Sequence, residues 1–197
     1  MKSIVYLIVL IITISGCATV GVPLTFNPDS KLSYAISLLE LDRPLPAEPL
    51  IQEAIDIYEK RDDNIGLANA YRSYALFLKS EAVKNWEKGY RRHGFMDKTA
   101  TFDNRYKKAM EYFEMARDIY EEHHHYDALS NIYLNMGKLS YFQFHDDAAA
   151  CANFTKSLEC HLKFKEDNPN TKIDLPSGFT SYENYISAIK KEAGCAK

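Results

Sequence analysis

The sequence has few glycines and prolines in its middle part, and it lacks the short motifs that mark common catalytic sites. Only 8 of its 197 residues are Gly and 7 are Pro, and few of these lie between Ala47 and Asp167. Because both residue types interrupt helices, this stretch predicts one helical domain. The chain contains no glycine-rich phosphate loop, no Gly-x-Ser-x-Gly and no His-Glu-x-x-His motif. We therefore expect neither an enzyme nor a bound cofactor or small-molecule substrate.

An excess of positive charge is also absent. The chain carries 24 Lys and Arg against 27 Asp and Glu, which gives a net charge of -3. Proteins that bind nucleic acid usually present a basic surface to the phosphates. We therefore expect no nucleic-acid partner.

The apolar run from Ile4 to Ile14 is too short to span a bilayer. It follows Lys2 and has 11 residues, whereas a transmembrane helix needs roughly 20. A charged start, a short apolar segment and small residues before a cut site predict a secretory signal that is removed after export.

The end of this segment, Ile14-Ser15-Gly16-Cys17, resembles the lipobox of bacterial lipoproteins. In that family the Cys thiol takes a diacylglycerol, the chain is cut before it, and the new amino group is acylated, which anchors the protein to a membrane. The resemblance implies a signal peptide over residues 1–16 and a mature protein that begins at Cys17. Ala18 is not the Asp that keeps such lipoproteins at the inner membrane, so an outer-membrane anchor facing the periplasm is implied. The alternative is an ordinary secretory signal with an incidental Cys.

Three further cysteines, Cys151, Cys160 and Cys195, allow at most one disulfide among themselves. A separation of nine residues along a helix places Cys151 and Cys160 on opposite faces, too far apart to bond. Two alternatives stay open. Either Cys195 bonds to one of the other two and fastens the C-terminal tail to the preceding helix, or all three thiols are unpaired.

An internal repeat sets the expected fold. Residues 56–78 align with residues 118–140 without a gap, at an offset of 62, and the sequence Asp-Ile-Tyr-Glu begins both. Large residues one turn apart beside a small residue, as in Tyr71-x-x-Tyr74-Ala75, are typical of a helix that another helix approaches closely.

The expected partner helices carry complementary stripes. These are Ala109-x-x-x-Phe113-x-x-Ala116, Ala150-x-x-x-Phe154-x-x-Ser157 and the weaker Ala47-x-x-x-Ile51-x-x-Ala54. Together the two patterns resemble tetratricopeptide repeats over about residues 30–166. The resemblance implies an all-α fold, a short right-handed solenoid of about three antiparallel helix pairs with a C-terminal capping helix. The chain departs from the family in its longer helices and in an insertion of 22 residues between Leu78 and Ala109.

We expect helices near residues 30–41, 47–61, 64–90, 104–123, 126–143, 146–166 and 180–193. The third of these would extend into the insertion, residues 81–104, which then continues as a loop broken at Gly89 and Gly94. Residues 17–29, with Gly21, Pro23 and Pro28, predict a tether. Residues 30–197 form the expected helical domain, and its last helix lies within 178–197.

In tetratricopeptide proteins, partner peptides lie along the concave surface made by the first helix of each pair. The positions of this chain that correspond to that surface are polar, and none of them is acidic. They are Asn69, Arg72, Ser73, Lys79, Asn131, Asn135, Lys138 and Tyr141. Asn amides suit an extended peptide backbone, and Arg or Lys suits a carboxylate on that peptide. The alternative is a solvated helix face without a ligand.

The insertion offers a second candidate surface. It carries the only Trp, Trp86, with Tyr90, Phe95, Phe102 and a basic cluster of Lys84, Lys88, Arg91, Arg92 and Lys98. Aromatic residues beside arginines are enriched in protein interfaces, and a positive surface also attracts anionic lipid headgroups. The alternative is that the aromatic residues pack the insertion onto its own domain while the charges stay in water.

The triplet His123-His124-His125 does not predict a metal site, because consecutive helical residues point about 100° apart.

Two functions remain. The first is a scaffold or assembly lipoprotein that binds another envelope or secreted protein. The second is an immunity lipoprotein that inhibits a toxic enzyme delivered to the periplasm. The neighbouring genes would separate the two.

Overall fold

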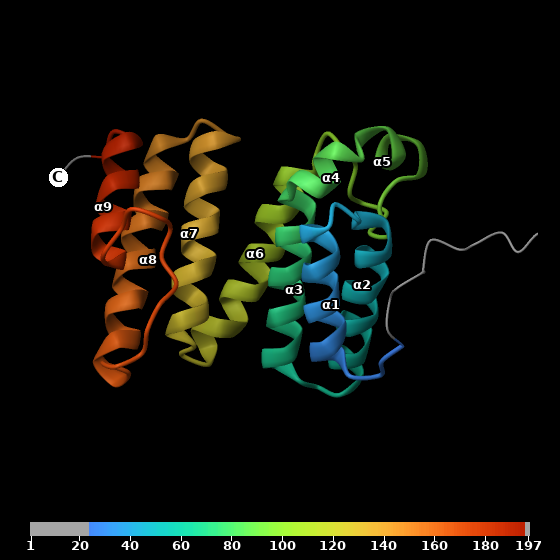
Figure 1. Ribbon diagram of the computed structural model, residues 1–197, viewed down its shortest axis with the longest axis horizontal. Coiled ribbons are helices and arrows are strands. Elements are labelled where there is room, and N and C mark those ends of the chain that lie inside the picture. Colours follow the sequence, from blue (N-terminus) through green and yellow to red (C-terminus); the bar gives the residue numbers. More distant parts are fainter. Residues whose placement is uncertain (1–23, 196–197) are drawn as a thin grey trace, which may run out of the picture.

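The computed structural model describes residues 24–195, in which all regular secondary structure is helical. The lipobox, Cys17 and the first part of the expected tether lie outside these residues. The described helices are α1 (Pro28–Glu40), α2 (Pro44–Lys60), α3 (Asn64–Lys79), α4 (Glu81–Asn85), α5 (Glu87–His93), α6 (Arg105–Glu122), α7 (Tyr126–Phe142), α8 (Asp147–Asp167) and α9 (Tyr182–Glu192) (Figure 1). The prediction of an all-α fold is confirmed.

The long helices pack as three neighbouring pairs: α1 with α2, α3 with α6, and α7 with α8. Helix α2 also contacts α3, α6 contacts α7, and α9 lies against α8, so the three pairs and α9 follow one another in chain order along the longest axis of the molecule (Figure 1). The short helices α4 and α5 lie together at one end of α3. The insertion therefore leaves the pairing of α3 with α6 intact.

Most helix boundaries lie within three residues of the sequence expectation, and they have local causes. Asn27 Oδ1 accepts a hydrogen bond from Ser30 N (3.0 Å), and Pro28 follows in the first turn, where helices tolerate proline. Helix α1 thus begins inside the expected tether, and Pro44 begins α2 in the same way. The turns after α2 and α6 hold Asp62 and His124 at positive φ (53° and 56°), a conformation that ends many helices.

The expected helix over 64–90 is wrong. Helix α3 ends at Lys79, and Ser80 has extended backbone angles (φ -67°, ψ 151°). The Ser80 hydroxyl accepts a hydrogen bond from Val83 N (3.2 Å), so this serine starts α4 rather than continuing α3. Helix α5 follows at once and ends at Gly94, whose φ is +72°. The insertion is therefore two short helices and a loop.

Small residues lie where the helices approach most closely. The alanines of the expected stripes are fully buried: Ala47, Ala54, Ala75, Ala109, Ala116 and Ala150. Gly137 of α7 faces the Phe154 ring of α8, and a Cβ atom there would lie 2.5 Å from Phe154 Cε1. Between the same helices, Ser130 and Ser157 each donate a hydrogen bond to the other's carbonyl oxygen (3.0 and 2.7 Å). The spacing of small residues thus corresponds to the packing register.

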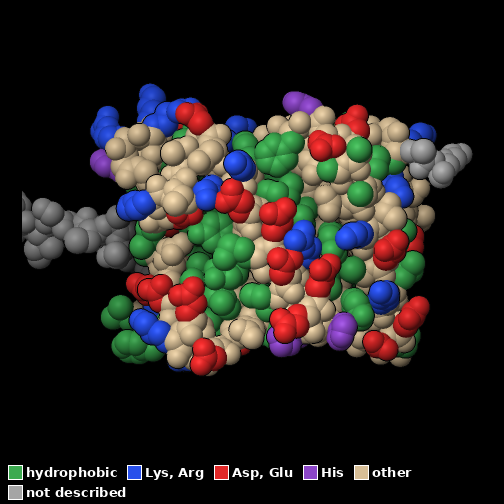
Figure 2. Space-filling view, turned by 180° about the vertical axis from the view of Figure 1, so that it is seen from behind, with side chains coloured by type: hydrophobic (Ala, Val, Ile, Leu, Met, Phe, Trp, Pro, Cys, Tyr) green, Lys and Arg blue, Asp and Glu red, His purple; other side chains and the backbone are tan. Residues whose placement is uncertain are grey.

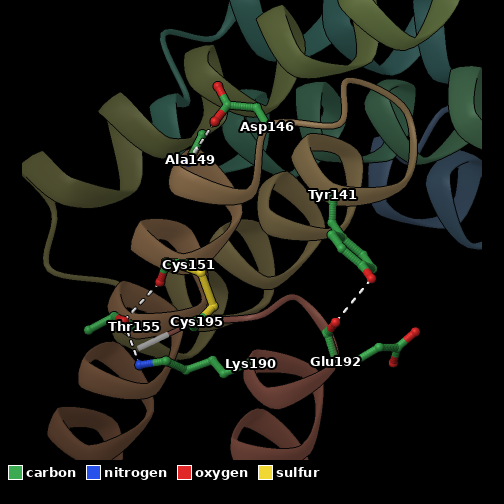
Figure 3. Close-up of a disulfide and its surroundings, with 8 residues drawn as sticks. All are labelled: Tyr141, Asp146, Ala149, Cys151, Thr155, Lys190, Glu192 and Cys195. Carbon is green, nitrogen blue, oxygen red and sulfur yellow. Dashed lines mark hydrogen bonds between the residues drawn. A yellow bond between two sulfur atoms is a disulfide. The ribbon is translucent and has the colours of Figure 1, made fainter. Parts of the chain in front are cut away.

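The buried side chains form two clusters, a larger one among α1 to α7 and a smaller one among α7, α8 and α9. A disulfide joins Cys151 of α8 to Cys195 after α9, with the two Cα atoms 5.5 Å apart (Figure 3). Of the alternatives left open for the cysteines, the bridge to Cys195 is the one present, and Cys160 is a free, half-buried thiol. The bridge fastens the C-terminal end of the chain beside the smaller cluster.

Candidate functional site

The residues expected to bind a peptide lie on α3 and α7, but several already serve the fold. Asn69 Oδ1 accepts a hydrogen bond from the Tyr120 hydroxyl of α6 (2.6 Å), and buried Ser73 donates to Asn69 O (2.8 Å). The Tyr141 hydroxyl donates to Glu192 O at the end of α9 (3.1 Å; Figure 3). Asn69 and Tyr141 therefore connect helices, and Ser73 is not accessible to a partner.

Asn131 and Asn135 form one unit on α7. Asn135 is buried, and its Nδ2 donates to Asn131 O (2.8 Å) and to Asn131 Oδ1 (3.2 Å). Asn131 itself is exposed. Asn131 is thus the amide that a ligand can reach, and Asn135 orients it.

The three cations of the expected set, Arg72, Lys79 and Lys138, are half-buried. None of the three forms an ion pair with another residue of the described chain. Burial lowers the pKa of Lys79, and the nearby charge of Lys138 lowers this pKa further. The Nε atom of Arg72 is buried and has no hydrogen-bond partner within residues 24–195. We call these three residues the cationic face.

No acidic side chain within residues 24–195 forms an ion pair with the cationic face, although Asp127 and Asp174 border the same cavity as Lys138. Taking a charged group out of water costs free energy unless an opposite charge or hydrogen bonds replace the water. A carboxylate placed beside Lys79 and Lys138 would favour their charged forms and accept hydrogen bonds from both ammonium groups. The face can therefore gain from an acidic partner in a way that a fully solvated face cannot.

A cavity of about 330 Å³ shares Lys138 with the cationic face. Leu134, Phe164 and Tyr185 are among its apolar walls, and Asn131 and His161 are among its polar groups. Sequence reasoning placed Asn131 and Lys138 on one helix face but missed the cavity. The other walls come from α8, α9 and the loop before α9, which no repeat pattern relates to α7.

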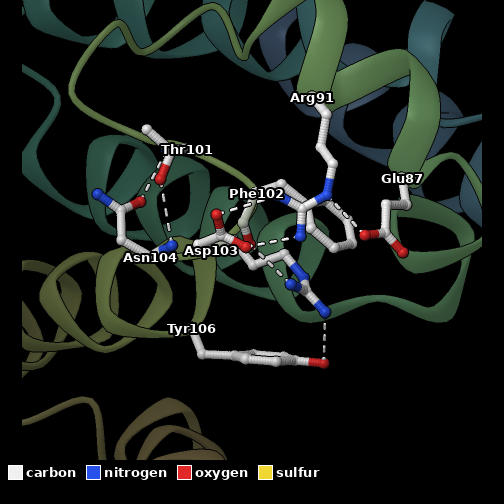
Figure 4. A network of polar contacts seen from close by, with 8 residues as sticks. Glu87, Arg91, Thr101, Phe102, Asp103, Asn104 and Tyr106 are labelled. Atoms are coloured by element: carbon white, nitrogen blue, oxygen red, sulfur yellow. Dashed lines mark hydrogen bonds and ion pairs between the residues drawn. The ribbon is translucent and has the colours of Figure 1, made fainter.

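The aromatic residues of the insertion are mostly core. Tyr90 is 2 % exposed and stacks on buried Phe95 with ring centres 4.4 Å apart, and Phe102 is also buried. Arg91 lies over the Phe102 ring and pairs with Glu87 and Asp103, each at 2.6 Å (Figure 4). For Tyr90 the structure therefore agrees with the alternative interpretation, in which the aromatic residues pack the insertion onto its own domain. Arg91 makes its contacts within the insertion.

A buried carboxylate helps to hold the insertion in place. Glu48 Oε1 of α2 accepts hydrogen bonds from the Tyr74 hydroxyl (2.8 Å) and from Met96 N (2.7 Å). Burial raises the pKa of Glu48, and these two hydrogen bonds oppose that shift. The Tyr112 hydroxyl donates to Asp97 Oδ2 (3.1 Å). The loop is thus connected to α2, α3 and α6, and no sequence motif marked Glu48.

Lys84, Lys88, Arg92, His93 and Lys98 are exposed on the insertion, as is Trp86; we call Lys88, Arg92, His93 and Trp86 the basic corner. Trp86 keeps 41 % of its surface exposed, while its Nε1 donates to Asp42 O (3.1 Å). Figure 2 shows Lys and Arg side chains gathered at this end of the molecule, at the upper left. Because these charges are already in water, a partner gains little by neutralising them.

The histidine triplet forms the turn between α6 and α7, and the His125 ring lies 5.8 Å from the Tyr120 ring. Within residues 24–195, no group of three or more His, Cys, Asp or Glu side chains is placed to hold a metal ion. In the same part of the chain, no helix combines the length and the apolar composition that crossing a bilayer requires.

Comparison with known proteins finds no matching family, no similar curated protein and no similar solved structure. The likeness to lipoproteins and to tetratricopeptide repeats thus depends on the residues quoted above. A function has to be argued from those residues and from the geometry of the described chain.

Proposed function

We propose that this chain is a lipid-anchored protein-binding module of the bacterial envelope. In this proposal Cys17 carries the acyl chains that hold the protein to the outer membrane on its periplasmic side. Helices α1 to α8 form a short right-handed solenoid of three tetratricopeptide-like pairs, and α9 is its cap. The partner is an acidic segment of another envelope or secreted protein, bound at the cationic face.

Repeated contacts support the solenoid. The Tyr71 hydroxyl of α3 donates to Glu59 Oε1 of α2 (3.4 Å), and the Tyr133 hydroxyl of α7 donates to Glu121 Oε1 of α6. Both residues of the second contact lie 62 positions after those of the first, which is the offset of the sequence repeat. The same contact thus joins the first pair to the second and the second pair to the third.

The observation that carries the binding proposal is the uncompensated charge of Arg72, Lys79 and Lys138. A folded chain that served only structural needs would gain nothing from half-burying three cations that form no ion pair within residues 24–195. An acidic partner supplies the missing counter-charge, and charge-assisted hydrogen bonds are the stronger kind. The basic corner is the weaker candidate because its charges are solvated and Tyr90 is not accessible.

The test begins with the full-length protein cross-linked in intact envelopes, which identifies the partner. The affinity of the purified full-length chain for that partner is then measured by calorimetry. Changing Lys79→Gln and Lys138→Gln together removes both charges while keeping polar side chains. Affinity should fall at least ~10-fold, since a hydrogen bond to a charged group contributes about 1.5–3 kcal/mol. Wild-type binding should also weaken as salt is raised.

A matched control removes two charges elsewhere. Lys60→Gln with Lys107→Gln alters exposed residues of α2 and α6 and should leave the affinity unchanged. The melting temperatures of both double variants should stay near that of the wild type. If the Lys79 and Lys138 variant binds normally while Trp86→Ala with Arg92→Glu abolishes binding, the binding surface is the basic corner.

A further inference from the structure

The third helix pair departs from the first two at one position. Tyr58 of α2 and Tyr120 of α6 each follow the last alanine of their stripe by four residues, and each is at most 2 % exposed. Each hydroxyl donates to the first helix of its own pair, Tyr58 to Asp29 (2.5 Å) and Tyr120 to Asn69 (2.6 Å). In α8 the corresponding position, four residues after Ser157, is His161.

The acceptor of the second pair also has a counterpart in the third. Asn131 of α7 lies 62 positions after Asn69. An imidazole is shorter than a phenol, and within the described chain no hydrogen bond joins His161 to Asn131. Both residues instead line the cavity. In the third pair this acceptor therefore meets no tyrosine; Asn131 Oδ1 accepts one hydrogen bond, from Asn135 Nδ2 (3.2 Å), and an amide oxygen can accept a second.

Helix α9 fills only part of the space. The Tyr182 ring stacks on the His161 ring at 4.4 Å, and its hydroxyl lies 3.1 Å from Ser130 Oγ and 2.7 Å from Ser157 Oγ. The volume that remains is the cavity of about 330 Å³. Ligand pockets of proteins begin near this size, at roughly 300 Å³.

We propose that this cavity binds a phenolic ring, in the place where the first two pairs hold a tyrosine of their own. Leu134, Phe164 and Ile173 supply apolar walls, and Tyr185 supplies a ring face. Asn131 can accept a hydrogen bond from the phenol hydroxyl, as Asn69 does from Tyr120.

The charges of the lining favour a neutral ring with a hydroxyl over an anionic one. Asp127 and Asp174 both line the cavity, and these two carboxylates outnumber its one lysine, Lys138, so a carboxylate on the ligand is disfavoured. Burial lowers the pKa of His161, which favours its neutral form. The ring can belong to a free phenol or to a tyrosine of a bound protein segment. Only the second case rests on the proposed function.

The experiment uses protein-observed NMR of the full-length chain in lipid nanodiscs, following the ring protons of His161 and, for the variant that lacks this residue, those of Tyr185, which also lines the cavity. Two probes represent the two sources: phenol for a free ligand and N-acetyl-tyrosinamide for a tyrosine within a peptide. If both probes cause saturable changes in chemical shift, the site binds a tyrosine side chain. If phenol alone causes them, the site binds free phenols. N-acetyl-phenylalaninamide lacks the hydroxyl and should bind more weakly than the tyrosine compound, by a few-fold to ~10-fold.

Two variants test the geometry. His161→Tyr restores the residue of the other pairs, so it should fill the cavity and weaken binding at least ~10-fold without lowering the melting temperature. Asn131→Ala removes the hydrogen-bond acceptor and should lower the affinity for phenol and for N-acetyl-tyrosinamide by a few-fold to ~10-fold. His93→Tyr makes the same substitution at an exposed histidine of α5 and should change nothing.

Two results would overturn the proposal. One is the lack of any saturable shift at His161 with either hydroxyl-bearing probe. The other is equal binding by the wild type and the Asn131→Ala variant together with equal affinity for the tyrosine and phenylalanine compounds. This second result would overturn the proposal even if the His161→Tyr variant fails to fold, because it does not depend on that variant. Neither result bears on the cationic face, whose test uses a protein partner.

Discussion

Replacing Gly137 by Ala tests how tightly α7 and α8 pack, because its two expected effects have opposite signs. Gly137 lies inside α7, where Ala is favoured over Gly by about 1 kcal/mol. The added Cβ would however lie 2.5 Å from Phe154 Cε1 and 2.6 Å from Phe154 Cδ1. The Phe154 ring is 1 % exposed, so it can move only by displacing its neighbours, which should cost about 1–3 kcal/mol. We expect a net loss of up to about 2 kcal/mol.

A double-mutant cycle with Phe154→Leu separates the two effects. Leucine lacks the ring atoms that the new Cβ would meet. In the Phe154→Leu background, Gly137→Ala should therefore stabilise the protein by about 1 kcal/mol, the full helix preference. The matched control is Gly89→Ala in α5, where the added Cβ would lie 3.6 Å from Trp86 Cε3, an ordinary contact. This control should not destabilise the protein.

The assay is chemical denaturation followed by circular dichroism, with the disulfide kept oxidised. For a chain of this size, 1 kcal/mol corresponds to a shift of about 2–4 °C in melting temperature. A gain in the free energy of unfolding from Gly137→Ala with Phe154 present would refute the reasoning. It would mean that α7 and α8 can separate at this point at little cost.

Three further predictions concern other parts of the chain. Reducing the Cys151–Cys195 disulfide, whose cysteines lie 44 positions apart, should lower the free energy of unfolding by about 2–4 kcal/mol because the closed loop no longer restricts the unfolded chain; identical thermal melts with and without reductant would contradict this. Because burial raises the pKa of Glu48 above its usual 4.5, the native state keeps this proton to higher pH than the unfolded chain, and stability falls as pH rises above about 4.5. Glu48→Gln keeps an acceptor for Tyr74 and Met96, so it should match the wild type below about pH 4.5 and be more stable than the wild type at pH 7; an equal difference in stability at both pH values would show that Glu48 does not titrate as stated. Cys17→Ser should leave the signal uncleaved or release the protein from the membrane fraction, as checked by immunoblot of fractionated cells, and normal processing with outer-membrane retention would rule out the lipobox.

Sequence reasoning succeeded where neighbouring residues decide the structure. The stripes that contain Ala109 and Ala150 predicted buried helix faces, since side chains three and four positions apart share one face of a helix. It failed at Ser80, because a serine inside a helical pattern can either continue the helix or cap a new one. The choice depends on where the following residues can pack, and that is a tertiary contact. The positively charged residues of the insertion were likewise visible in the sequence, but the partners of Arg91 were not.

The sequence by itself determined where the long helices lie, apart from the end of α3, and which small residues their packing requires, because helix formation and helix faces follow from local spacing. Only the tertiary structure decided that Cys195 bonds to Cys151 and that Tyr90 is core. It also decided that Lys79 and Lys138 lie near each other, with no ion pair to either among residues 24–195, and that His161 and Asn131 border a cavity. Each of these facts is a distance between groups far apart in the chain, set by how whole helices pack, and no local pattern encodes such a distance.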